Sequence, residues 1–161
     1  MPDVWTLIVY SLLLYPIEAE PASRAYDELL DARVEIATAC AVATDDQFER
    51  FTCMKVARFE SSYRPDVARC DVRGSAGEVT AWQIIPRSKG EVDRLCSSLA
   101  EGARAHVALA RQSRQACRAY PRADQLAVYT RGSCTSAEGR RLSRHRYPDP
   151  HELRRLEELM R

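Results

Sequence analysis

Six widely separated cysteines constrain the fold of this chain more than any other feature of its sequence. An even number of cysteines is typical of disulfides in a protein exposed to an oxidising compartment, which predicts an extracytoplasmic location. No CxxC pair occurs and only three histidines accompany the cysteines, so we do not expect a zinc site. Buried free thiols are the alternative. The cysteines are Cys40, Cys53, Cys70, Cys96, Cys117 and Cys134.

The sequence leaves the disulfide pairing open, because six cysteines can be joined in many ways. Cys40 and Cys53 are a candidate local pair, since a turn is predicted between their helices. With 161 residues the chain is long enough for one compact domain with a core of its own. A net charge of +1 gives no reason to expect a nucleic-acid partner, and we expect no cofactor.

The residues from 4 to 15, VWTLIVYSLLLY, form the one strongly apolar run. The run is too short to span a bilayer comfortably, and it resembles the core of a signal peptide or anchor. Asp3 stands where a signal peptide carries positive charge, so an N-terminal helix packed on the domain is the other interpretation. We therefore divide the chain into a segment 1–23, with a linker that begins at Pro16, and a catalytic domain 24–161.

Apolar spacing and capping signals predict a mostly helical domain. Between residues 66 and 86, however, the chain contains two glycines followed by β-formers such as Val79, Thr80 and Ile84, which predicts a loop and a short β-hairpin or small sheet. Together these features predict an α+β fold, mostly helical, with the β element beside a cleft. Helices are expected over 24–43, 45–61, 89–113 and 123–130, with a last one after Asp149.

Glu60 is the candidate catalytic residue. It lies near the end of the helix predicted over 45–61, and Pro65 makes the chain turn just after it. A carboxyl at the edge of an apolar pocket can stay protonated near neutral pH, because burial penalises the charged form. Such an acid can protonate the leaving oxygen of a glycosidic bond. A solvated glutamate at a helix end is the structural alternative.

Three segments in order resemble the soluble lytic transglycosylase domain, which is lysozyme-like and related to goose-type lysozymes. The segment 60–65, ESSYRP, is similar to the family's ES-x-aromatic-x-P signature. The segment 81–86, AWQIIP, is similar to its G-[LP]-[MW]-Q-I-x-P segment, and 126–132, LAVYTRG, to its L-A-x-Y-N-x-G segment. Thr80 or Ala81 replaces the usual glycine, and Thr130 replaces the usual asparagine. The resemblance spans residues 45–134 and implies a lysozyme-like fold.

The resemblance also implies roles for individual residues. Glu60 would act as general acid and then as general base, and Ser61 would support its hydrogen bonds. Trp82 would line the cleft and stack on a sugar, while Gln83 would contact the substrate. Tyr129 would lie close to Glu60 and help to set its orientation. Each has a structural alternative: a helix cap for Ser61, and buried core aromatics for Trp82 and Tyr129.

The implied activity is cleavage of the β-1,4 bond between MurNAc and GlcNAc in peptidoglycan, with formation of 1,6-anhydro-MurNAc ends. One glutamate suffices for that reaction, whereas hydrolysis usually needs a second acid, for which Asp66, Asp71 and Glu78 are candidates. A lysozyme-type hydrolase and a non-catalytic wall-binding component of a secretion or phage assembly are the alternatives. The run 140–146, RRLSRHR, is interpreted as a solvated face or a contact for anionic wall polymers.

Overall fold

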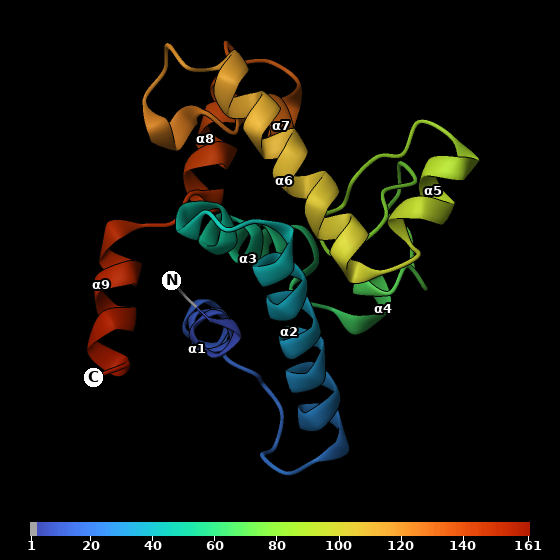
Figure 1. The fold of residues 1–161 in the computed structure, drawn as a ribbon, viewed down its shortest axis with the longest axis vertical. Coiled ribbons are helices and arrows are strands. Elements are labelled where there is room, and N and C mark those ends of the chain that lie inside the picture. The colour runs from blue at the N-terminus through green and yellow to red at the C-terminus, as the bar shows by residue number, and fades with distance from the viewer. Residues whose placement is uncertain (1–2) are drawn as a thin grey trace.

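The computed structural model describes residues 3–161, and within this range the regular secondary-structure elements are all helices. Figure 1 shows α1 end-on between α9 and α2, with α6 crossing the molecule from α7 and α8 towards α5. No helix in the described part of the chain is both long and apolar enough to cross a membrane. The elements are α1 (Val4–Leu14), α2 (Arg24–Ala43), α3 (Gln47–Ser61), α4 (Pro65–Ala68), α5 (Lys89–Leu95), α6 (Leu99–Ala116), the 3₁₀ turn η1 (Arg122–Asp124), α7 (Ala127–Arg131), α8 (Ala137–Arg146) and α9 (Pro150–Leu159).

The prediction of an α+β, lysozyme-like fold with a small hairpin or sheet is wrong. Between residues 3 and 161 the only β contact is an isolated antiparallel bridge between Val79 and Ile84. Thr80 and Gln83 both have positive φ angles, +69° and +49°, so the chain turns back at once and cannot extend the ladder. Pro86 then removes the backbone donor that a longer strand would need.

The helix predicted over 89–113 is in fact two helices, α5 and α6. Ser88 and Glu91 have the spacing of a capping box, and Ser88 does cap α5, but α5 ends at Leu95. A second cap follows, because the Ser98 hydroxyl accepts from the amide of Glu101 at the start of α6. The sequence therefore holds two N-cap signals, and both are used.

Three disulfides join neighbouring elements. Cys40–Cys53 ties α2 to α3 and confirms the candidate local pair. Cys70–Cys96 ties the loop after α4 to the end of α5, and Cys117–Cys134 ties the end of α6 to the loop after α7. Three disulfides fit an extracytoplasmic protein.

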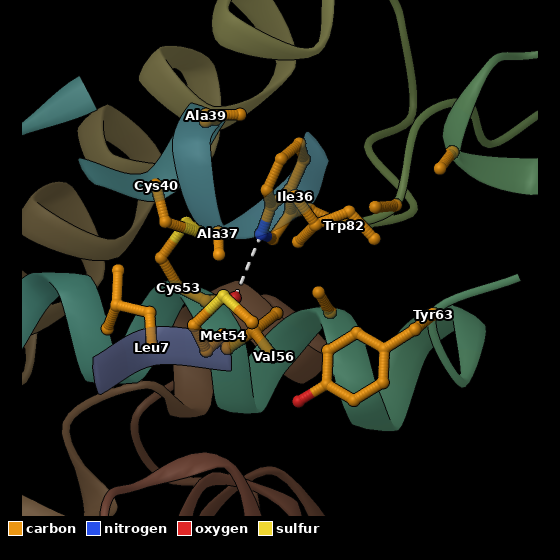
Figure 2. Close-up of a cluster of buried hydrophobic side chains, with 14 of the residues drawn as sticks. Leu7, Ile36, Ala37, Ala39, Cys40, Cys53, Met54, Val56, Tyr63 and Trp82 are labelled. Carbon is orange, nitrogen blue, oxygen red and sulfur yellow. Dashed lines mark hydrogen bonds between the residues drawn. A yellow bond between two sulfur atoms is a disulfide. The ribbon is translucent and has the colours of Figure 1, made fainter. Parts of the chain in front are cut away.

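The apolar N-terminal run forms α1, which packs against α2, α3 and α9. Leu7 and Tyr10 are fully buried there, and the Tyr10 hydroxyl donates to Glu152 of α9 at 3.1 Å. The run is therefore part of the core in this structure, together with buried residues of α2 and α3 (Figure 2). The domain division at residue 23 stays a prediction.

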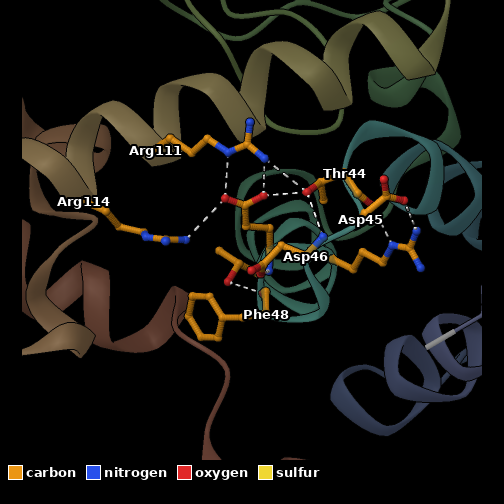
Figure 3. Close-up of polar contacts among 9 residues, drawn as sticks. Thr44, Asp45, Asp46, Phe48, Arg111 and Arg114 are labelled. Atoms are coloured by element: carbon orange, nitrogen blue, oxygen red, sulfur yellow. Dashed lines mark hydrogen bonds and ion pairs between the residues drawn. The ribbon is translucent and has the colours of Figure 1, made fainter. Parts of the chain in front are cut away.

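A buried carboxylate fastens the start of α3 to α6 (Figure 3). Both oxygens of Glu49 accept from the Arg111 guanidinium, at 2.8 and 2.7 Å, and Arg114 lies 3.5 Å away. Thr44 and Gln47 have the spacing of a capping box, which predicts Thr44 as the helix cap. That prediction is wrong, because the Thr44 hydroxyl donates to Glu49 at 2.6 Å and Asp46 caps the helix. Burial raises the pKa of Glu49, but these hydrogen bonds outweigh it and hold the pKa below its ordinary value.

Candidate active site

Glu60 lies at the end of α3, where the chain leaves the helix abruptly. Ser62 and Tyr63 both adopt left-handed backbone conformations, with φ of +54° and +58°. Such conformations are unfavourable for residues other than glycine, and they persist only where packing fixes them. The buried Tyr63 ring supplies that packing (Figure 2). This turn leaves the Glu60 side chain 22% exposed, beside a cavity rather than in bulk water.

The cavity has a volume of about 410 Å³, which is within the range of small-ligand sites. Its walls come from the end of α3, the segment 78–85, α6, α7 and the end of α8. Glu60, Gln83 and Tyr129, which belong to the three separate motifs, all line it. Its charged and hydrogen-bonding side chains include Glu60, Glu78, Gln83, Tyr129, Arg131 and Arg146.

Tyr129 is held rigidly at the wall of this cavity. Its hydroxyl donates to the Trp82 carbonyl at 2.8 Å, and its ring contacts His106 edge-on. Burial raises the pKa of Tyr129, and the negative charge of Glu60 raises it further. The phenol is therefore neutral, and it donates its proton to the Trp82 carbonyl and not to Glu60. The implied role of Tyr129 in orienting Glu60 stays a prediction.

Gln83 reaches the same cavity from a tight turn. Its side-chain amide donates to the Thr80 carbonyl at 3.0 Å. Its amide oxygen lies against Gly74, because a Cβ atom there would be 2.8 Å from that oxygen and would overlap the Glu78 carboxylate. Gln83 lines the cavity, and its contact with a ligand stays a prediction.

Ser61 and Trp82 lie outside the cavity, and their implied roles find no support in their surroundings. The Ser61 hydroxyl is buried and donates to the Ala57 carbonyl in its own helix at 2.9 Å. The Trp82 side chain is fully buried, and its indole N–H donates to the Cys53 carbonyl at 2.9 Å (Figure 2). Trp82 cannot stack on a sugar from this position. It supports the site through its backbone carbonyl, which anchors Tyr129.

Of the three candidate second acids, only Glu78 lines the cavity. One of its carboxylate oxygens accepts from the Ala76 amide at 2.8 Å. Asp71 is exposed, and Asp66 pairs with Arg64 at the start of α4. Within residues 3–161 no group of three His, Cys, Asp or Glu side chains could hold a metal ion.

Arg146, the ion-pair partner of Glu60, is a functional residue that the sequence does not reveal. Its Nε lies 2.6 Å from a Glu60 carboxylate oxygen, and its side chain is only 11% exposed. The run 140–146 is interpreted from sequence as a solvated face or a contact for anionic wall polymers, and nothing in linear spacing brings together two residues that are 86 positions apart. The ion pair bears directly on chemistry, since an acid that gives up a proton must first be uncharged.

The comparisons with known proteins add no relative. No family model, no curated protein and no solved structure matches this chain.

Proposed function

We propose that the protein is a peptidoglycan lytic transglycosylase that cleaves the β-1,4 bond between MurNAc and GlcNAc. The observation that carries this proposal is the convergence of Glu60, Gln83 and Tyr129 on one cavity of about 410 Å³. These residues lie up to 69 positions apart (129 − 60) and belong to three separate sequence motifs. Three unrelated weak matches would have no reason to meet in space.

The conformation of Thr80 gives a second, independent support. In the family's segment the residue three positions before the glutamine is usually glycine, and here it is Thr80. Thr80 has a φ of +69°, in the left-handed region that favours glycine and is costly for a β-branched residue. The departure is thus one of residue type, while the backbone still adopts the conformation to which glycine is suited.

In the proposed reaction Glu60 donates its proton to the glycosidic oxygen, which leaves as the 4-hydroxyl of GlcNAc. The N-acetyl group of MurNAc assists as the bond to C1 breaks. The Glu60 carboxylate then takes the proton of the MurNAc 6-hydroxyl while that oxygen bonds to C1, which closes the 1,6-anhydro ring and restores the acid. Before the first step the ion pair with Arg146 must open, because a paired carboxylate has no proton to give.

Two other functions each have one observation in their favour. Glu78 lines the same cavity and could serve as the second acid of a hydrolase, in which two carboxyl groups flank the bond. The ion pair between Glu60 and Arg146 favours a wall-binding component without catalysis, for instance in a secretion or phage assembly. Either function would use the same ligand and the same extracytoplasmic setting.

Digestion of purified sacculi, followed by mass spectrometry of the released muropeptides, separates the three functions. We expect 1,6-anhydro-MurNAc ends from the wild type and a loss of at least about 100-fold in Glu60→Gln. Glu35→Gln is the matched control, because Glu35 also pairs with an arginine, Arg69, but on the surface away from the cavity. Reducing ends that vanish in Glu78→Gln would identify a hydrolase. Binding to sacculi without any product would leave only the structural component.

A further inference from the structure

Arg146 stands between two cavities. Its Nε holds Glu60 of the first, while its guanidinium carbon lies 5.8 Å from the centre of the Phe59 ring. Phe59 is a wall residue of a second cavity of about 530 Å³, bounded by α1, α3 and the connection from α8 to α9.

The pairing of Arg146 leaves much of its hydrogen-bonding capacity unused. Nε donates to Glu60, Nη1 donates to the Leu142 carbonyl in the same helix, and Nη2 donates to no group within residues 3–161. A guanidinium has five N–H donors and binds a carboxylate best through two parallel bonds. The contact with Glu60 uses one of them, so a second carboxylate could compete for Arg146 with a better geometry.

Arg146 is held by few partners. It is the last residue of α8, and within residues 3–161 its guanidinium donates, besides Glu60, only to a carbonyl of its own helix. A second arginine, Arg131, lines the same cavity, and its guanidinium donates only to the neighbouring Thr130 carbonyl within the described chain. The rim of the cavity therefore offers cationic donors to an anionic ligand.

We propose that Arg146 is a latch on Glu60, and that a carboxylate carried by the saccharide ligand releases it. In the resting protein Arg146 holds Glu60 as its ion-pair partner. A bound saccharide that bears a carboxylate pairs with Arg146 in its place, and Glu60 is left free to act as the acid. The cavity then selects acidic saccharides, such as those substituted with a peptide, over neutral ones. This inference rests on the proposed function for its catalytic consequence, but the exchange of partners is a binding event with a readout of its own.

The test uses two ligands that differ in one charge: a GlcNAc–MurNAc dipeptide with a free terminal carboxylate, and the same compound with that carboxylate amidated. Dissociation constants are measured by calorimetry for the wild type, Arg146→Gln and Arg141→Gln. Arg141 is the matched control, because it also pairs with a glutamate, Glu138, on the same helix but lies outside the cavity. The NMR signal of the Arg146 Nε–H group is followed in the wild type, so that the answer does not depend on how a variant folds. Acetate alone is the third arm and shows whether a free anion suffices.

We expect the wild type to bind the carboxylate form about tenfold more tightly than the amide, as one charge-assisted hydrogen bond provides. Arg146→Gln should bind both forms alike, and Arg141→Gln should keep the preference. The Arg146 signal should move with the carboxylate ligand and not with the amide or with dilute acetate. A wild type that binds both forms equally, binds neither, or responds equally to acetate overturns the latch, as does a preference that survives in Arg146→Gln.

The binding measurements involve no bond cleavage, so their result tests the role of Arg146 independently of the proposed function. If the protein binds the carboxylate ligand tenfold more tightly than the amide but releases no muropeptide, the exchange of partners by Arg146 is supported and the transglycosylase activity is refuted. Anhydro ends from a protein that ignores the ligand's charge would do the reverse.

Discussion

The placement of Tyr129 depends on a serine in another helix, and Ser113→Ala should show this directly. The amide of Tyr129 lies in the first turn of α7, where backbone donors have no partner within the helix, and α7 has no side-chain cap of its own. The Ser113 hydroxyl, fully buried on α6, accepts from that amide at 3.0 Å and donates to the Gln125 carbonyl at 2.8 Å. One hydroxyl therefore satisfies two backbone groups that hold the cavity wall in place.

The size of the effect follows from those two bonds. Each buried backbone group that loses its partner costs about 1–3 kcal/mol, so Ser113→Ala should lower the free energy of unfolding by about 3 kcal/mol. For a chain of 161 residues this corresponds to a fall in Tm of about 6–12 °C. Urea and thermal unfolding followed by circular dichroism measure both quantities.

Ser143→Ala is the matched control for this substitution. Ser143 is equally buried on α8, accepts from the Leu126 amide at 2.9 Å and donates to the Ala123 carbonyl at 2.6 Å. The two variants should lose similar stability, but only Ser113→Ala should shift the NMR signals of Tyr129 and weaken saccharide binding. A loss below about 1 kcal/mol in Ser113→Ala would refute the argument that this hydroxyl serves as the remote cap of α7.

Three further predictions concern stability. Replacing Cys117 and Cys134 by alanine opens a loop of 17 residues, which should lower the free energy of unfolding by about 3 kcal/mol and weaken saccharide binding at the cavity. Urea unfolding of the oxidised wild type and of the variant measures the loss, and equal midpoints would contradict the prediction. Burial lowers the pKa of His106 to about 3, against about 6.5 in an unfolded chain, so between pH 6.5 and 3 only the unfolded state binds the proton and the free energy of unfolding should fall as pH decreases. His106→Leu should reduce the slope of unfolding free energy against pH by about 1.4 kcal/mol per pH unit. An unchanged slope would show that His106 takes up its proton while the protein is folded. Trp82→Phe should lower the free energy of unfolding by about 1–3 kcal/mol, because the hydrogen bond to the Cys53 carbonyl and some packing volume are lost, while saccharide affinity stays the same. Weaker saccharide binding at unchanged stability would instead show that Trp82 contacts the ligand.

The sequence by itself determined the features that depend on near neighbours in the chain. Ser88 precedes Glu91 by three residues and Asp149 precedes Glu152 by three, which is the spacing of an N-terminal cap, and Gly132 is a typical C-terminal cap. In the structure Ser88 caps α5, Gly132 ends α7 with a φ of +70°, and Asp149 with Glu152 forms the capping box of α9. These signals are reliable because both partners of each hydrogen bond lie within four residues of each other. The same locality explains why the turn after Glu60 could be predicted from Pro65.

Only the tertiary structure decided the features that join distant segments. The local pattern of residues 66–86 favours strands, but the segment has no second strand to pair with beyond one bridge, and its positive φ angles stop the ladder. Trp82 could line a cleft or fill the core, and its burial was settled by the space that α2, α3 and α6 leave between them. Arg146 meets Glu60, and Ser113 caps α7, through contacts that packing alone creates. The sequence around a charged or hydroxyl side chain does not indicate which distant group that side chain will contact in the folded protein.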